Sequence, residues 1–301
     1  MQKYNYTTLN SYLQDVFGEK VYKLALDGGM TCPNRDGNID TRGCIFCSAG
    51  GSGDFSEEYN VDINLQIEKA KQRVSRKFKG DKYIAYFQSY TNTYADIDYL
   101  KSLFFRAIEN PSIVALSIGT RPDCLGEEVL SLLSVLNNIK PVFVELGLQT
   151  IHKKTAEFIR RGYELSVYDK AVEELKKRNI NVVVHIILGL PDETKAMMLE
   201  TVKYVISSGA DGVKLQLLHI LKGTDLEKLY NCGKVSVLTL KEYADILCDC
   251  VKLIPESVVI HRLTGDAPKK LLIAPEWSAD KKSVLNYINK EFALNNIFPL
   301  K

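Results

Sequence analysis

Three cysteines in the first third of the chain have the type and spacing to do chemistry. They lie in the segment DGGMTCPNRDGNIDTRGCIFCSAGGSG, where eleven residues separate Cys32 from Cys44 and two separate Cys44 from Cys47. The two sulfurs of a C-x-x-C pair converge on one side of a tight turn, and Cys32 would add a third thiolate. No histidine lies between residues 1 and 151. The segment therefore predicts a centre with three nearby protein ligands and no fourth.

Three interpretations of these cysteines remain open from spacing. A structural zinc ion needs four protein ligands in a closed tetrahedron, so the fourth would have to come from a distant residue such as His152, His185 or Cys124. A redox-active C-x-x-C pair would leave Cys32 unexplained. An iron–sulfur cluster on three thiolates leaves one iron open to a substrate or cofactor. The iron–sulfur cluster is the favoured interpretation.

Strand-like and helix-like segments alternate along the chain and must position this centre. Apolar, β-rich runs occur at Val21–Leu26, Lys82–Phe87, Ile113–Ile118, Pro141–Leu148, Asn181–Leu188, Gly212–Leu218 and Val258–Leu263. Several are almost continuously apolar, as strands buried on both faces are, and residues with helical spacing lie between them. Repeated strand–helix units predict a parallel sheet, either an open partial barrel or a doubly wound sheet.

Functional residues gather at the carboxyl ends of the strands in both of these folds. The cysteine segment follows the first predicted strand and therefore belongs to this edge. Polar, glycine-rich turns follow later strands, at Gln88–Thr93, Gly119–Pro122, Gly147–Thr150 and Gly189–Pro191. Ordinary turn chemistry explains any one of these turns but explains their recurrence less well. We therefore expect ligand contacts there, because glycine lets the backbone approach a ligand closely.

The composition describes an ordinary globular protein. The 301 residues are 46% hydrophobic and 25% charged, with 39 Lys and Arg against 37 Asp and Glu. These proportions exclude a disordered or fibrous chain. An odd count of seven cysteines argues against a disulfide framework. No apolar run approaches the roughly 18 residues of a membrane span, and the N-terminus has no apolar signal region. These features predict a cytoplasmic protein without a membrane partner.

The cysteine loop resembles that of the radical S-adenosylmethionine (SAM) superfamily, with an aromatic residue, Phe46, directly before the third cysteine. Most members have three residues between the first two cysteines, and this chain has eleven. The longer gap resembles the branch that contains the elongator catalytic subunit. The strings LDGGMTCPNRDG and GCIFCSAGGSGDF look closer still to the YhcC-like bacterial branch. The likeness runs from about Tyr6 to Asp266, nearly the whole chain.

The resemblance implies a fold and a domain organisation. The expected fold is α/β, a partial (β/α)6-type TIM barrel of the radical SAM kind. An N-terminal extension would occupy residues 1–20, the radical SAM core residues 21–268, and a C-terminal extension residues 269–301. Within the last of these, the segment from Trp277 to Lys301 is expected to form a cap or docking helix.

The resemblance also implies two cofactors. Cys32, Cys44 and Cys47 would hold a [4Fe–4S] cluster whose fourth iron is chelated by SAM. A donor such as flavodoxin or ferredoxin would supply one electron, which cleaves SAM to methionine and a 5′-deoxyadenosyl radical. That radical would take a hydrogen atom from the substrate, while the protein orients the reactants and excludes water. No catalytic residue beyond the cluster ligands can be assigned.

Three SAM contacts follow from motifs shared with relatives. Gln149, in GLQT, would lie beside SAM. Arg161 would pair with the SAM carboxylate, which suits the bidentate guanidinium, and His185 would lie near the ribose. Each has a plainer alternative. Arg161 follows Arg160 at a helix end, where cations suit the helix dipole, and His185 in VVVHIIL resembles a hydrogen-bonded core histidine.

Four further contacts are expected where this chain departs from its relatives or matches them only in part. Leu190 lies in the turn that relatives place beneath the adenine. Relatives carry Gly-Gly-Glu or a variant after the second strand, where this chain offers Asn92. Some relatives have an acid after the third strand, where this chain has Thr120. Glu145 could supply the missing ribose contact, although strand alternation could equally turn it outward.

The leading substrate implied by the resemblance is tRNA, modified on the wobble-uridine side chain. Basic residues that could meet a phosphate backbone cluster between Lys69 and Lys82, around Arg160, and at Lys176–Arg178. A solvated helix face is the plainer explanation of such clusters. The string HRLTGDAP, with His261, Arg262, Thr264 and Asp266, follows the last predicted strand, where substrate groups could lie. A small metabolite or protein side chain is the alternative substrate, and a non-catalytic zinc-stabilised binding protein is the alternative class.

Overall fold

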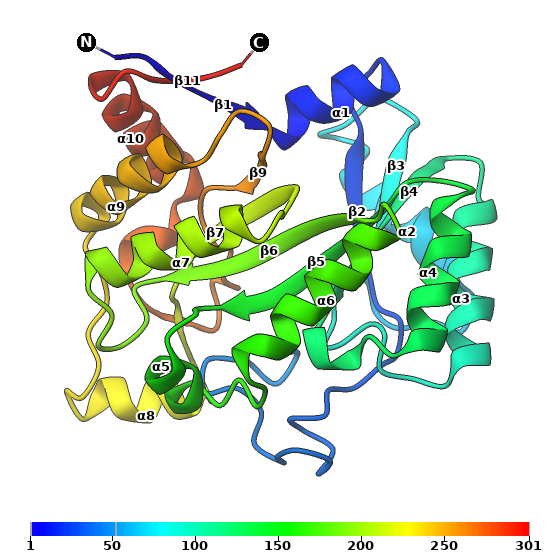
Figure 1. Ribbon diagram of the computed structural model, residues 1–301, viewed down its shortest axis with the longest axis horizontal. Coiled ribbons are helices and arrows are strands. Elements are labelled where there is room, and N and C mark those ends of the chain that lie inside the picture. The colour runs from blue at the N-terminus through cyan, green and yellow to red at the C-terminus, as the bar shows by residue number, and fades with distance from the viewer. Residues whose placement is uncertain (1, 52, 301) are drawn as a thin grey trace.

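The computed structural model describes residues 2–51 and 53–300 and contains one large sheet with helices around it (Figure 1). The strands are β1 (Tyr4–Thr8), β2 (Tyr22–Leu26), β3 (Tyr83–Phe87), β4 (Ile113–Thr120), β5 (Val142–Gln149), β6 (Asn181–Leu188), β7 (Gly212–Leu217), β8 (Ile220–Leu221), β9 (Val259–Arg262), β10 (Leu272–Ala274) and β11 (Ile297–Pro299). Nine of them form one sheet in the order β11-β1-β9-β7-β6-β5-β4-β3-β2, and β8 pairs with β10 separately. All seven predicted strands are present, with ends within two residues of the expected ones.

The helices fill the connections between these strands. They are α1 (Leu9–Phe17), α2 (Ile63–Val74), α3 (Ile97–Glu109), α4 (Glu127–Asn137), α5 (Lys153–Phe158), α6 (Leu165–Lys177), α7 (Lys195–Ser207), α8 (Asp225–Asn231), α9 (Leu240–Leu253) and α10 (Lys281–Leu294), with short 3-10 turns η1 (Pro122–Cys124) and η2 (Glu276–Ala279). In Figure 1, α6 and α7 lie over the face of the sheet turned to the viewer. Among the described residues, no helix combines the length and apolarity needed to cross a bilayer.

The six strands from β2 to β7 confirm the expected partial (β/α)6-type barrel. Each of these strands pairs in parallel with the next one along the chain. At least one helix lies in the connection that follows each of the strands β2 to β6. The barrel is open, because β2 and β11 lie at opposite edges of the sheet in the described part of the chain. Parallel strands covered in this way are buried on both faces, and all five residues of β3 are buried. The open sheet leaves its carboxyl edge free for a site.

Both terminal extensions join the same sheet. β1 pairs in parallel with β9 on one side and with β11 on the other, so both chain ends extend the barrel beyond β9. The ring of Tyr6 in β1 packs edge-on against Phe292 of α10, with centroids 5.8 Å apart. β1 was not expected, because YNYTT is short and mostly polar. The boundaries expected for the core, 21–268, stay a prediction.

Candidate functional site

The loop from β2 to α2 carries the three cysteines and is held by its own polar side chains. Asn34 is buried, and its Nδ2 donates to the carbonyl oxygen of Arg160 (2.7 Å) and approaches the sulfur of Cys44 (3.5 Å). The Arg35 guanidinium donates to the Ser48 carbonyl at 2.6 Å. These bonds tie both halves of the loop to each other and to the end of α5. Polar anchors therefore fix a segment that has no helix or strand of its own.

Backbone geometry in the same loop requires a glycine between Asn34 and Cys44. Gly43 has φ +74°, and a Cβ there would lie 2.9 Å from Nε of Arg35. Its N–H donates to the Asn34 carbonyl at 2.7 Å, which closes the turn leading into Cys44. A left-handed conformation and a close contact together favour glycine at this position. The eleven-residue spacing is therefore accommodated by a compact, closed loop.

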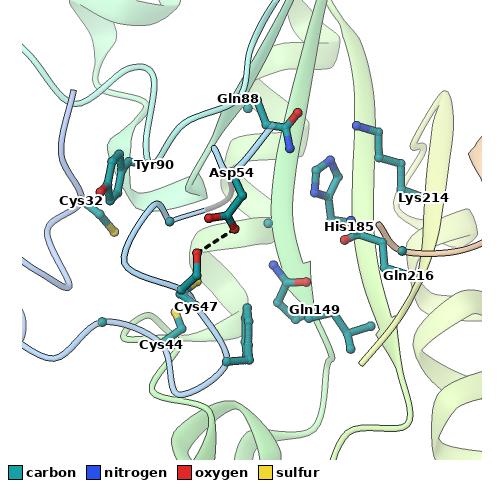
Figure 2. A pocket seen from close by; sticks show the side chains of 18 of the residues that line it. Cys32, Cys44, Cys47, Asp54, Gln88, Tyr90, Gln149, His185, Lys214 and Gln216 are labelled. Atoms are coloured by element: carbon teal, nitrogen blue, oxygen red, sulfur yellow. Dashed lines mark hydrogen bonds between the residues drawn. The ribbon is translucent and has the colours of Figure 1, made fainter. Parts of the chain in front are cut away.

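All three cysteines line one cavity over the carboxyl ends of the barrel strands. The cavity holds about 230 Å³. Figure 2 shows Cys32, Cys44 and Cys47 on one side of it, and His185 among the side chains on the other. A hydrogen bond from Cys47 is the main reason that the pKa of the Cys44 thiol falls to about 6. The same contact raises the pKa of the Cys47 thiol well above its usual range, so this pair holds one thiolate more readily than two.

The cysteine arrangement distinguishes a zinc ion from an iron–sulfur cluster. In residues 2–51 and 53–300, no three His, Cys, Asp or Glu side chains are grouped closely enough to hold a single metal ion. A zinc ion needs each sulfur about 2.3 Å from one point. The thiolates of a [4Fe–4S] cluster bind three separate irons and so lie farther apart. Of the three residues that could complete a zinc site, Cys124 and His152 do not line the cavity, and His185 lines it on the side away from the cysteines. Among the described residues, the three cysteines therefore do not form a single-ion zinc site.

Gln149 lies at the end of β5 and carries an unpaired acceptor. Its Oε1 is buried and has no hydrogen-bond partner among the described residues. Its backbone has φ +70°, a left-handed conformation that is uncommon for a residue with a side chain. In Figure 2 its amide lies between the cysteines and His185. A buried, unsatisfied carbonyl oxygen in a cavity is a feature that a bound ligand would explain.

Arg161 is buried behind Gln149 and already holds the backbone in place. Its Nη1 donates to the carbonyl oxygens of Thr150 (2.7 Å) and Leu148 (3.4 Å), and its Nε and Nη2 donate to that of Tyr163. Its guanidinium lies 4.4 Å from the Tyr163 ring centroid. Arg161 lines the cavity, so the alternative of a solvated base at a helix end is wrong. Its contact with a SAM carboxylate stays a prediction.

Glu145 points into the barrel and is the centre of a buried charge network. Its Oε1 accepts from Lys23 (2.7 Å) and Ser117 (2.6 Å), and its Oε2 accepts from His185 (2.7 Å) and Lys214. Burial alone would raise the pKa of this carboxyl, but the charges of Lys214 and Lys23 hold it well below the usual range. Four donors occupy the carboxylate, so it has little capacity left for a ribose.

His185 lies beside this network; it is hydrogen-bonded to Glu145, as the plainer alternative of a core histidine expects, and it also lines the cavity. Burial, followed by the charge of Lys214, lowers the pKa of the His185 imidazole to about 4. The ring is therefore neutral at physiological pH and donates Nε2–H to Glu145. Thr120 also lines the cavity, and its hydroxyl lies 2.6 Å from that of Thr93. The contacts of His185 and Thr120 with SAM stay predictions.

Two of the seven expected SAM contacts, Asn92 and Leu190, do not line the cavity. Asn92 is fully buried, and its Nδ2 and backbone N–H both donate to the carbonyl oxygen of Gly119. Leu190 is buried in an apolar cluster with Ile187 and Leu218, which do form part of the cavity wall. The Asn92 side chain ties the β3 turn to β4, and Leu190 packs against residues of the cavity wall. Their contacts with SAM stay predictions.

Sequence reasoning missed the lysines that hold Glu145. Lys23 in VYKLAL and Lys214 in GVKLQL each interrupt an otherwise apolar strand, and that interruption was the available signal. Lys214 is 4% exposed, and its Nζ also donates to the hydroxyl of Tyr86 at 3.0 Å. A charged residue in a buried strand needs a partner, and here the partner comes from another strand. Of the four HRLTGDAP residues expected near a substrate, Arg262 and Asp266 line the cavity, whereas His261 and Thr264 do not.

Substituting Asn34 with alanine is expected to loosen the cluster without removing a ligand. The change removes the donors to Arg160 and to the Cys44 sulfur, and losing such an outer partner typically weakens metal binding about 10–100-fold. The measurement is the rate at which a chelator removes iron from the reconstituted protein. Asn38→Ala is the matched control, because Asn38 lies exposed on the same loop. Equal rates of iron loss from the two variants would contradict a supporting role of Asn34 at the cluster.

Comparison with known proteins agrees with this geometry. The sequence profile of the radical SAM superfamily matches residues 38–205, and that of the radical SAM C-terminal domain matches residues 210–293. YtqA of Bacillus subtilis is 46% identical over 95% of this chain and 89% of its own length. YhcC of Escherichia coli is 37% identical over 88% of this chain and 85% of its own length.

Two more distant relatives carry informative names. The tRNA uridine(34) acetyltransferase of Methanocaldococcus jannaschii is 28% identical over 53% of this chain and 30% of its own length. Among solved structures, Methanocaldococcus infernus Elp3 with an N-terminal deletion covers 90% of this chain and 63% of that one, with a TM-score of 0.68 at 20% identity. The latter likeness concerns the fold alone. The family match and the identity to YtqA and YhcC show that the chain belongs to the radical SAM superfamily and is an enzyme of that superfamily.

Proposed function

We propose that Cys32, Cys44 and Cys47 hold the [4Fe–4S] cluster that membership of the superfamily implies, and that Gln149 contacts SAM. The supporting observation is the shared cavity, where three thiol groups face the unpaired carbonyl oxygen of Gln149. When bound, the cluster and SAM supply a 5′-deoxyadenosyl radical that removes a hydrogen atom from the substrate. The proposal includes an external one-electron donor such as flavodoxin or ferredoxin.

The other cavity residues orient the ligand and keep water away. Arg161 uses most of its N–H groups on the backbone and retains one Nη2–H for a carboxylate. Phe46, Ile187 and Leu218 add apolar lining, continuous with a hydrophobic cluster beneath it. An apolar, enclosed wall strengthens the polar contacts made inside it. Such a lining also protects a reactive radical from side reactions.

We further propose that the substrate is tRNA, at the side chain of its wobble uridine. Support comes from the relatives named tRNA uridine(34) acetyltransferase and from the fold shared with Elp3. The test is mass spectrometry of tRNA nucleosides from a strain that lacks this protein, beside the same strain complemented with it. Loss of one wobble nucleoside is expected. Unchanged nucleosides would refute tRNA as the substrate and leave a small metabolite or protein side chain.

The basic clusters seen in the sequence do not form a tRNA surface at the cavity. Arg160 pairs with Asp225 at 2.6 Å, and the 176–178 cluster is paired with neighbouring carboxylates. The basic residues after α2 precede β3, so the chain places them at the amino ends of the strands, opposite the cavity. Exposed lysines near the cavity rim include Lys222, Lys269 and Lys270, beside the lining residues Leu221 and Pro268.

Changing Lys222, Lys269 and Lys270 together to glutamine is therefore expected to weaken tRNA binding. Removing one lysine–phosphate pair should reduce the salt slope of log K by about 0.7–0.9, so removing three pairs should reduce it by about 2–3. The measurement is tRNA affinity across a salt series. The matched control changes Arg76, Lys77 and Lys79, which are also exposed but lie at the far end of the barrel. Equal losses of affinity in both triple variants would contradict a rim-bound tRNA.

A further inference from the structure

The cavity has a second polar wall that the proposed cluster and SAM contacts leave unused. Lys214 and Gln216 project from β7, Arg262 ends β9, and Asp266 follows it. Figure 2 shows Lys214 and Gln216 across the cavity from the three cysteines, with Gln149 between the two sides. We call the set Lys214, Gln216, Arg262 and Asp266 the β7–β9 wall.

Strand register brings the two cations of this wall together. Lys214 in β7 is the Cα partner of His185 in β6 on one side and of Arg262 in β9 on the other. Residues paired in this way in parallel strands project to the same face of the sheet. All three residues line the cavity. The result is a row of three nitrogen-bearing side chains across adjacent strands: the neutral His185 imidazole, the Lys214 amine and the Arg262 guanidinium.

Two lysines donate to the first carboxylate of this region, that of Glu145. Glu145 accepts from Lys23 at 2.7 Å and from Lys214, which is the more deeply buried of the two. One negative charge therefore faces two potential positive charges. Burial is the main reason that the pKa of the Lys214 ammonium falls to about 7. The cavity disfavours this cation as long as no further anion is present.

The second carboxylate is shared in the same way. Asp266 lies 3.4 Å from Arg262 and 2.6 Å from Lys281. The histidine that lines this region, His219, adds no charge, because burial lowers its pKa to about 4. Its Nε2 is buried without a partner among the described residues. The wall thus combines an excess of cations with an unsatisfied polar atom, and buried charges of this kind call for a counter-ion.

Donor groups remain available for such an ion. Lys214 has three N–H bonds and uses two of them, on Glu145 and on the Tyr86 hydroxyl. Arg262 makes one ion pair, with Asp266, in the described part of the chain. Gln216 adds an amide on the same face of β7, two residues from Lys214. Ammonium, guanidinium and amide donors on one wall match the acceptors of an oxyanion.

We propose that Lys214 and Arg262 bind an oxyanion of the substrate, a phosphate or a carboxylate, on the β7–β9 wall. The inference rests on the proposed function, because it makes the side of the cavity opposite the cysteines the substrate side. For tRNA the bound group is a backbone phosphate beside the target nucleoside. For a small metabolite it is the metabolite's own phosphate or carboxylate.

The experiment measures anion binding to the anaerobically reconstituted protein in the presence of SAM, by equilibrium dialysis. Uridine 5′-monophosphate against uridine tests the phosphate, and malonate tests the carboxylate. Lys214→Met and Arg262→Gln are each expected to weaken binding of the preferred anion at least about tenfold. Lys214→Arg should retain most of it. Lys203→Met, an exposed change on α7, is the matched control.

Each outcome decides the assignment. Preference for the nucleotide over uridine, lost in both variants, supports a phosphate subsite. Preference for malonate, lost in both, supports the subsite and identifies a carboxylate substrate. Unchanged binding in both variants, or an equal loss of SAM binding, overturns the proposal. Arg262 lies outside the buried Glu145 pair, so Arg262→Gln remains a test if Lys214→Met unfolds. Failure of the proposed function would show separately, as stoichiometric zinc without sulfide in the reconstituted parent protein.

Discussion

Replacing Cys44 with alanine is expected to abolish SAM cleavage and to empty the metal site. Three thiolates are the only protein ligands proposed for the cluster, so losing one leaves two irons without protein ligands. Iron and sulfide content should fall to background after anaerobic reconstitution. With SAM and a strong reductant, 5′-deoxyadenosine should form in the parent protein and not in the variant. Cys32→Ala and Cys47→Ala should behave alike, because all three sulfurs line the same cavity.

Cys232→Ala is the matched control for these variants, because Cys232 lies exposed just after α8 and does not line the cavity. It should retain iron, sulfide and 5′-deoxyadenosine formation. Parent-level product from Cys44→Ala would remove this residue from the ligand set. Stoichiometric zinc without sulfide in the parent protein would overturn the proposed cluster itself. A bound cluster without 5′-deoxyadenosine formation would mean either that SAM does not bind or that cleavage requires the substrate.

Glu145→Gln is expected to destabilise the fold by about 3–5 kcal/mol, the loss typical when one partner of a buried ion pair is removed. The change keeps the shape of the side chain but leaves the buried Lys214, and Lys23 beside it, without a negative partner. Urea unfolding at neutral pH measures the difference. Glu173→Gln is the control, because its pair with Lys177 is exposed and such pairs contribute about 0–1 kcal/mol.

The pH dependence gives this prediction a second readout. The pKa of Glu145 in the folded protein lies well below its usual range, so its stabilising effect is full above the unfolded pKa of about 4.3 and is lost as pH falls through the folded value. The difference in unfolding free energy between the parent protein and Glu145→Gln should therefore become smaller at acidic pH. Adding Lys214→Met to Glu145→Gln should recover part of the lost unfolding free energy, since the double variant no longer has the unpaired Lys214 cation. A Glu145 variant as stable as the Glu173 variant would contradict the network.

Much of the fold was predictable from residues close together in the chain. Almost continuous apolar runs identified seven of the nine strands in the main sheet, because burial on both faces leaves a local pattern. The cysteine spacing identified the loop for the same reason, since a C-x-x-C pair is defined by its own turn. The strands β1 and β11 were not predicted, because YNYTT and IFP are too short to carry a periodic signal.

The same distinction between local and long-range information applies to the residues of the site. The cysteines were recognisable from their own spacing, and Gln149 and His185 from motifs that resemble those of relatives. The network around Glu145 was not recognisable, because it joins Lys23, Glu145 and Lys214 from strands far apart in sequence. Asn92 and Leu190 do not line the cavity, because a turn's sequence does not say which of its side chains faces inward.

Sequence by itself determined the parallel strand–helix order and the cysteine loop, which depend on spacing along the chain, and the resemblance of that loop to the radical SAM superfamily pointed to the open barrel. Only the tertiary structure decided which charges meet. Strand order and register align Lys214 with Arg262, and the return of α2 carries the most basic stretch away from the cavity. Charge pairing depends on distances across the sheet, and those distances are set by packing of the whole chain and not by any local pattern.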